Sequence, residues 1–180
     1  MLNIRRSRDA DVPAITTIYA FYVDTGTATF ETVAPDEVEM QRRRRLLIER
    51  RYPYFVAEID GEVCGYAYAG PYRTRSAYYC TVENSVYVKT SAQRRGIGKA
   101  LLHTLIQACT DQGFHQMVAI IGDSAHIASI RLHRAVGFQI VGTLQNVGHK
   151  HGRWLDTVLM QLSLNDTSTA RPKPLTDDRP

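Results

Sequence analysis

The 180-residue sequence has few cysteines, no long apolar run and little net charge. Its three cysteines, Cys64, Cys80 and Cys109, form no Cys-x-x-Cys pair, which argues against a zinc knuckle or a disulfide framework and predicts free thiols. No apolar window of about 18 residues is present, and the first residues lack the apolar core of a signal peptide. These absences predict a soluble, cytoplasmic protein without a membrane partner.

The net charge of +4 favours anionic ligands but is too small to indicate a nucleic-acid partner. Much of the excess comes from Arg42–Arg45, followed by Arg50 and Arg51, in a segment with helical apolar spacing. Surfaces that bind single-stranded RNA interleave aromatic residues with the basic ones, and this run has none. We therefore expect a solvated helix face, with RNA binding as the alternative.

Hydrophobic residues make up 44% of the chain and charged residues 22%, which is typical of a globular domain. The apolar spacing predicts strands at 2–5, 54–59, 63–69, 78–88, 117–121, 138–147 and 154–162. It also predicts helices capped by Asp9 or Asp11, from 35 to about 51, at 96–112 and at 125–136. This order indicates an α/β domain at 1–163, followed by a disordered polar tail at 164–180.

The most informative segment is Gln93–Ala100, which lies between a predicted strand and a predicted helix. Gly96 and Gly98 carry no Cβ that could block a ligand, and the first N–H groups of a helix lack intrahelical partners. With the nearby cations, the segment predicts a pyrophosphate site, and a plain tight turn is the alternative. Leu101 departs from the Rossmann fingerprint, and Gln93 and Ala100 depart from the Walker pattern.

Residues 93–98, Gln-Arg-Arg-Gly-Ile-Gly, resemble the acetyl-CoA pyrophosphate loop of the GCN5-related N-acetyltransferase (GNAT) superfamily. Segments 78–88, 118–122, 129–133 and 148–154 resemble the phosphinothricin acetyltransferases of that superfamily, and the similarity extends over residues 1–162. The resemblance implies a three-layer fold: a mixed central sheet of about seven strands with helices on both faces. Relatives in this branch acetylate methionine sulfoximine, methionine sulfone and other amino acids.

The resemblance also implies acetyl-CoA as the co-substrate, with no metal. The pantetheine arm is expected to pair with the main chain of Val86, Tyr87 and Val88. The remaining cofactor-binding candidates are Gln93, Arg94, Arg95, Gly96, Ile97, Gly98, Lys99, His126 and Ser129. His126 stands where relatives usually have an Asn that contacts CoA, so either the histidine replaces that contact or the contact is lost.

Acetyl transfer to an amine needs a base, because an α-ammonium group has a pKa of about 7.7–8.0 and is mostly protonated at neutral pH. Glu83 is the candidate base, and a place on the wet face of its strand is the alternative. His133 lies four residues before Gly137, where many superfamily members carry the tyrosine acid, so it is the candidate acid. A structural role for His133 is the alternative.

Five residues match positions that line the acceptor pocket in this branch, namely Phe30, Glu31, Arg73, Arg75 and Tyr78. Arginine is suited to a bidentate grip on a carboxylate or phosphinate, although each could equally be a solvent-facing loop residue. Tyr79 and Cys80 differ from the commoner family residues. His149 and His151 supply two metal ligands without an obvious third.

The sequence therefore predicts an acetyl-CoA-dependent N-acetyltransferase that acts on the α-amino group of a small amino acid or analogue, such as phosphinothricin. Direct attack in a ternary complex is favoured, since no cysteine lies in a nucleophile motif. Acetylation of a protein N-terminus or a polyamine is the alternative reaction, and a non-catalytic CoA sensor is the alternative class. The resemblance also implies a homodimer formed through the C-terminal strands.

Overall fold

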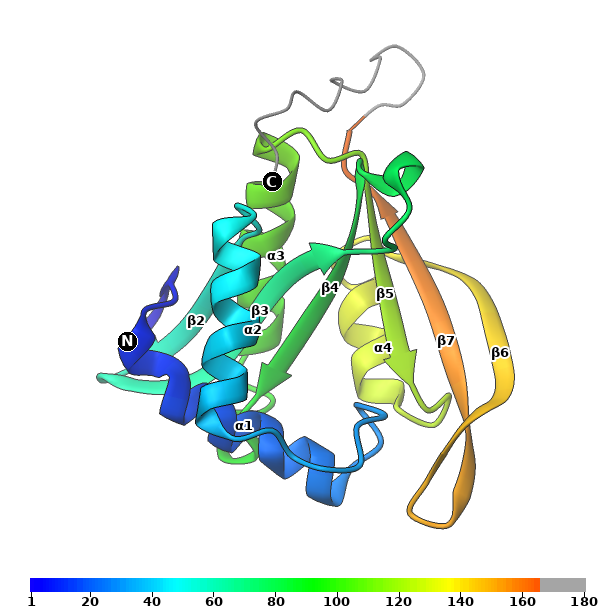
Figure 1. Cartoon of the computed structure of the whole chain (residues 1–180), viewed down its shortest axis with the longest axis horizontal. Helices are drawn as coiled ribbons and strands as arrows, with labels where there is room; N and C mark the ends of the chain where they lie inside the picture. The colour runs from blue at the N-terminus through cyan, green and yellow to red at the C-terminus, as the bar shows by residue number, and fades with distance from the viewer. Residues whose placement is uncertain (166–180) are drawn as a thin grey trace.

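A seven-stranded mixed sheet forms the centre of the computed structural model, which describes residues 1–165 (Figure 1). Its strands are β1 (Leu2–Arg6), β2 (Tyr54–Ile59), β3 (Glu62–Pro71), β4 (Thr81–Val88), β5 (Gln116–Gly122), β6 (Gln139–Lys150) and β7 (Arg153–Ser163). They lie in the order β1-β2-β3-β4-β5-β7-β6, and β4 and β5 are the one parallel pair among the described strands. The predicted mixed sheet is confirmed.

Helices cover both faces of this sheet, as predicted. Helices α1 (Val12–Thr25) and α2 (Glu37–Glu49) share one apolar cluster, whereas α3 (Ile97–Asp111) and α4 (Ile127–Arg134) belong to another. Successive side chains of a strand point to opposite faces. Accordingly, Val56 packs with the α1–α2 cluster, and its neighbours Phe55 and Ala57 pack with the α3–α4 cluster.

Local sequence signals set several of the boundaries between elements. The Asp36 side chain accepts a hydrogen bond from the Glu39 N–H and caps α2. Asp60 and Gly61 have φ angles of 51° and 86°, the positive values that a two-residue hairpin turn requires, so the predicted hairpin forms between β2 and β3. Gly113 follows the end of α3 with a φ of 80°, as a helix-terminating glycine does.

Three expectations about individual elements are wrong. The strand predicted to begin at Tyr78 begins at Thr81, because Ser76–Tyr78 form a short 3₁₀ turn. The apolar run at 117–121 predicts a strand covered on both faces, but Ile120 of β5 is 38% exposed, so this strand is not covered along its whole length. Asp11 lies at the start of α1, but its side chain does not cap that helix, because it accepts from the Arg8 N–H and closes the preceding 3₁₀ turn.

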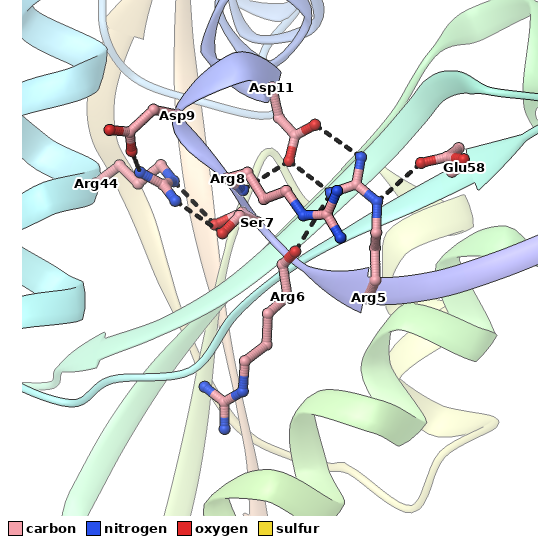
Figure 2. Close-up of polar contacts among 8 residues, drawn as sticks. All are labelled: Arg5, Arg6, Ser7, Arg8, Asp9, Asp11, Arg44 and Glu58. Carbon is pink, nitrogen blue, oxygen red and sulfur yellow. Dashed lines mark hydrogen bonds and ion pairs between the residues drawn. The ribbon is translucent and has the colours of Figure 1, made fainter.

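The solvated face predicted for the arginine run of α2 is confirmed for Arg42 and Arg45, which are exposed, and is wrong for Arg44. Arg44 is buried and donates to the Ser7 hydroxyl at 2.9 Å, to the Ser7 carbonyl at 2.7 Å and to the Asp9 carboxylate (Figure 2). Arg43 pairs with Glu31 and Glu39. Arg44 therefore fastens α2 to the turn that follows β1.

A second arginine holds the same turn from the sheet side. Arg5 of β1 donates two bonds of 2.8 Å to the Asp11 carboxylate and one of 2.8 Å to Glu58 of β2 (Figure 2). Burial by itself raises the pKa of Asp11, but the bonds from Arg5 and from the Arg8 N–H outweigh it and lower the pKa. Arg5 and Arg44 together join β1, β2, the start of α1 and α2.

The predicted tail (164–180) lies outside the described residues except for its first two positions. The Leu164 N–H donates to the His115 carbonyl, and the Asn165 side chain donates to the Phe114 carbonyl at 2.7 Å. Both residues therefore extend the contacts of β7 with the domain. Within residues 1–165, no helix has the length and apolar character needed to cross a membrane.

Replacing Arg44 by alanine should lower the free energy of unfolding by about 2 kcal/mol, because the variant loses three charge-assisted hydrogen bonds and the packing of the buried stem. Urea denaturation measures this change. Arg45→Ala is the matched control on the same helix: its side chain is 67% exposed, so the change should stay within about 0.5 kcal/mol. Equal effects of the two substitutions would contradict the anchoring role of Arg44.

Candidate functional site

The site begins where β4 and β5 separate. Their parallel pairing covers four residue pairs, from Thr81 with Gln116 to Asn84 with Ala119. Beyond Asn84, β4 continues to Val88 along β3 alone, and β5 continues to Gly122 along β7 alone (Figure 1). The inner edge of residues 85–88 therefore has no strand partner and can pair with an extended ligand through main-chain groups, as the family resemblance implies for Val86, Tyr87 and Val88.

Two neighbouring cavities occupy this separation. One, of about 330 Å³, extends from the 93–99 loop along β4. The other, of about 320 Å³, contains Glu83, Asn84 and His133. The two cavities share five lining residues, which join them into one path: Ala28, Val86, Tyr87, His126 and Ser129. A long ligand bound at the loop can therefore reach the Glu83 end.

The 93–99 loop needs a glycine at positions 96 and 98 for two different structural reasons. Gly96 has a φ of 79°, and a Cβ added there would meet no atom within 4 Å, so the backbone is bare toward the cavity. At Gly98, a Cβ would lie 3.0 Å from the Leu132 side chain of α4, so this glycine allows α3 and α4 to pack closely. The predicted anion site at the N-terminus of α3 therefore depends on Gly96 for ligand access and on Gly98 for helix packing.

The predicted cations of this loop divide into two groups. Arg94 and Lys99 line the cavity, as do all the other cofactor-binding candidates except Arg95. The positive charge of Arg95 acts instead at the β2–β3 hairpin, where it favours a lower pKa for both Asp60 and Cys64. The structure thus brings two of the three expected cations to the site.

Tyr22 of α1 lines the site although the sequence did not single it out. Its hydroxyl donates to the Val88 carbonyl at 2.5 Å and accepts from the Gln93 side chain at 2.9 Å. Gln93 therefore fixes the start of the loop against the end of β4 as well as lining the cavity. A tyrosine on an amphipathic helix gives no sequence signal of this contact, because its partners lie 66 and 71 residues away.

Glu83 lies in the second cavity and is half-buried. Burial raises the pKa of its carboxyl group, and the positive charge of Arg73 opposes this by lowering it. A carboxyl group whose pKa moves toward neutrality becomes a stronger base when ionised. The geometry thus favours the functional alternative for Glu83 over a place on the wet face.

His133 is buried, with 3% of its surface exposed, and both ring nitrogens have partners. Nδ1 lies 2.8 Å from the Ser129 carbonyl, which can only accept, so Nδ1 carries the proton. Nε2 lies 3.0 Å from Asn84 Nδ2 and therefore accepts from it. Burial lowers the pKa of His133 and outweighs the bond to Ser129. In this arrangement Nε2 has no proton to give, so the predicted acid role needs a protonated ring and a turned Asn84.

His126 and Ser129, at the start of α4, line both cavities and lie where the two cavities meet. Burial lowers the pKa of His126 and outweighs the opposing charge of Asp123, so its imidazole favours the neutral form. The structure therefore places both predicted residues on the path of a ligand.

The acceptor candidates are divided by the structure. Phe30 lines the Glu83 cavity, but Glu31 does not, because its carboxylate accepts from Tyr19 and Arg43. Arg75 and Tyr78 are exposed and outside the cavity lining. Arg73 is also outside the lining and stacks over the Tyr72 ring, so it reaches Glu83 only through its charge.

Several further residues line the Glu83 cavity without having been predicted: Tyr19, Ala28, Thr29, Tyr68, Asn84, Ser85, Ala119, Ile120, Ile121, Gly122 and Thr157. The sequence carried a signal for Asn84, because it is a polar residue next to Glu83 in a strand whose apolar residues predict burial. Within the described residues, no group of three or more His, Cys, Asp or Glu side chains could hold a metal ion.

Known proteins resemble this chain over nearly its whole length. Residues 4–159 match the acetyltransferase (GNAT) domain family. Phosphinothricin N-acetyltransferase of Alcaligenes faecalis is 51% identical, over 95% of this chain and 87% of that protein. L-methionine sulfoximine/L-methionine sulfone acetyltransferase of Pseudomonas paraeruginosa is 41% identical, over 93% of this chain and 98% of that protein. This chain also superposes on the crystal structure of a GNAT superfamily phosphinothricin acetyltransferase from Sinorhizobium meliloti in complex with AcCoA, with a TM-score of 0.94. The identity is 44%, over 99% of this chain and 96% of that chain.

We expect the His133 ring to be neutral, with its proton on Nδ1, at pH 7.5, because burial lowers its pKa. Nitrogen-15 NMR of the imidazole distinguishes this form from the other tautomer and from the cation. Asn84→Asp should raise the pKa of His133, since a carboxylate beside Nε2 stabilises the cation, and Asn84→Leu should not. Exposed His103 provides reference signals in the same spectra. A doubly protonated His133 in the unsubstituted protein at pH 7.5 would contradict the arrangement.

Proposed function

The chain belongs to the GNAT acetyltransferase family and is an acetyl-CoA-dependent N-acetyltransferase, and we propose that its acceptor is the α-amino group of a small amino acid or an analogue. Phosphinothricin, methionine sulfoximine and methionine sulfone are the proposed analogues. The observation that carries this choice is the 51% identity to a phosphinothricin N-acetyltransferase over 95% of the chain. A cavity of about 320 Å³ at the Glu83 end is compatible with a small acceptor.

The residues along the path fit acetyl-CoA. The open backbone at Gly96, the helix N-terminus behind it and the cations Arg94 and Lys99 suit the diphosphate. The inner edge of Val86–Val88 has no strand partner and suits the amide-bearing pantetheine arm, which needs main-chain partners. When bound, acetyl-CoA supplies a thioester whose carbonyl carbon accepts the amine.

We propose Glu83 as the base that takes a proton from the acceptor amine, directly or through water. Glu83 lines the cavity, and burial raises the pKa of its carboxyl group. The raised pKa brings the group closer to the α-ammonium pKa of about 7.7–8.0, which reduces the free-energy cost of the transfer. We propose that His133 holds Asn84 in place in its neutral form, and that its role as an acid requires the rearrangement described above.

The cysteines support direct attack by the amine. Cys64 and Cys109 are buried, and burial raises the pKa of both thiols, that of Cys109 to about 12. A thiol that remains protonated at neutral pH is a poor nucleophile. None of the three cysteines lines the Glu83 cavity, so we propose transfer in a ternary complex without an acetyl-enzyme. Three unpaired thiols also fit the cytoplasmic location that we propose.

Exposed apolar side chains on the β6–β7 hairpin support a homodimer. Apolar residues that gather on a water-exposed surface often mark protein interfaces. The residues are Ile140, Val141, Leu144, Val147 and Trp154. We propose that two copies pair through this hairpin, which sedimentation equilibrium can test; a monomer at micromolar concentration would refute it.

The acceptor proposal predicts release of free CoA thiol with phosphinothricin, methionine sulfoximine and methionine sulfone. The measurement is the thiol-release rate at fixed acetyl-CoA, with spermidine and an N-terminal alanine peptide as competing acceptors. We expect kcat/KM for at least one of the three analogues to exceed that for the other two classes by tenfold or more, roughly 1.4 kcal/mol. The N-acetylated forms of the three analogues serve as controls, because their amine is blocked. Preference for the peptide or the polyamine would replace the proposal.

The base assignment predicts that Glu83→Gln lowers kcat about 10²–10⁴-fold. It also predicts the direction of a second change: the Arg73 charge lowers the pKa of Glu83, so Arg73→Ala should raise it and move the acidic limb of kcat/KM to higher pH. Arg75→Ala is the matched control, since its exposed guanidinium lies outside the cavity lining and should leave the limb in place. Wild-type turnover in Glu83→Gln would refute the assignment.

A further inference from the structure

The ring of Phe30 lies in a slot whose two walls are glycines. A Cβ added at Gly148 of β6 would lie 2.6 and 2.9 Å from the ring atoms Cδ2 and Cζ, and closer still to Cε2. A Cβ on Gly122 of β5 would lie 2.9 Å from Cε1, on the other edge of the ring. Carbon atoms in proteins do not approach so closely, so the ring can occupy this place only while both positions lack a side chain.

The backbone on both sides of Phe30 is held in place. The buried Lys150 donates to the Thr29 carbonyl at 2.9 Å, and Tyr19 bonds to both the Thr29 hydroxyl and the Glu31 carboxylate at 2.9 Å. Earlier in the same loop, the Thr27 hydroxyl donates to the Asp123 carboxylate at 3.1 Å. The ring is thus the part of the 29–31 segment that can move when its slot is filled.

Phe30 lines the Glu83 cavity, and Gly148 does not. A change at position 148 therefore acts on the cavity through the ring. This arrangement separates Gly148 from Gly122, which lines the cavity itself and lies against the Thr27 carbonyl as well.

We propose that Gly148 is a specificity-determining position for the acceptor, because its missing side chain lets β6 hold the Phe30 ring as a fixed wall of the acceptor cavity. The proposal rests on the N-acetyltransferase function proposed above and identifies a remote residue that controls its acceptor site. Gly148 is a positioning residue: it acts through Phe30 and does not touch the reacting atoms.

The test is a two-by-two set of variants, with KM for methionine sulfone, kcat, and Kd for acetyl-CoA as readouts. In the wild-type background, Gly148→Ala should raise KM for the acceptor about threefold to tenfold, a loss typical of a displaced binding wall. Both kcat at saturating acceptor and Kd for acetyl-CoA should stay within about twofold, since the loop at Gly96 and the base are untouched. In the Phe30→Ala background, Gly148→Ala should have no further effect on KM, because the ring that it displaces is gone.

Gly142→Ala is the matched control on the same strand. A Cβ at this position would meet no atom within 4 Å, so KM should be unchanged in both backgrounds. An unchanged KM in Gly148→Ala would overturn the proposal. An equal rise of KM in both backgrounds would also overturn it, since the effect would then not pass through Phe30.

Thermal unfolding separates a failure of this proposal from a failure of the proposed function. Gly148→Ala should lower Tm by about 3–8 °C in the wild-type background and by less than half as much in Phe30→Ala. This coupling is measured without any acceptor. If the coupling is present but no amino acid analogue is acetylated, Gly148 positions Phe30 and the proposed acceptor is wrong. If the coupling is absent, Gly148 does not position Phe30, and the proposal is overturned.

Discussion

The end of hydrogen bonding between β4 and β5, after Asn84 and Ala119, is the constraint on which the rest of the structure depends. Two parallel strands that stay paired leave no room for a ligand within the sheet. Once they separate, Val86–Val88 have no strand partner on their inner side, and the cavities on both sides of His126 become continuous. The site therefore forms where β4 and β5 are no longer paired in the middle of the sheet. Pairing with β3 holds β4 in place there, and pairing with β7 holds β5.

Local patterns were sufficient for the order of the elements and the α/β class, whereas the seven-stranded, three-layer fold came from the family resemblance. The Asp60–Gly61 turn, the helix-terminating Gly113 and the two-residue and 3.6-residue apolar periods place the elements to within a few residues. They failed where a tertiary contact overrides the local pattern. Arg44 has the sequence context of an exposed residue, but it is buried because Ser7, 37 positions earlier, supplies partners for the guanidinium.

The residues of the site also divide into those with a local sequence signal and those brought together only by tertiary contacts. Residues of the 93–99 loop could be found from the sequence because the Gly-x-Gly spacing next to cations is a local signal. The same spacing marks the turn between a strand and a helix. Phe30 and Gly148 could not be connected, since 118 positions separate them and a lone glycine in a strand has several explanations. Arg95 is the opposite case: it adjoins the motif in sequence but does not line the cavity, and its charge lowers the pKa of Asp60 in the β2–β3 turn.

Desolvation acts on Glu83 and His133, two of the titratable groups that line the Glu83 cavity, and drives each toward its neutral form. It raises the pKa of Glu83 and lowers the pKa of His133. The two effects have different consequences, because Glu83 keeps an opposing charge nearby at Arg73, whereas both nitrogens of His133 are occupied by Ser129 and Asn84. Glu83 can therefore exchange a proton without breaking a described hydrogen bond, and His133 cannot. This asymmetry supports the carboxylate as the base that we propose and a positioning role for the imidazole.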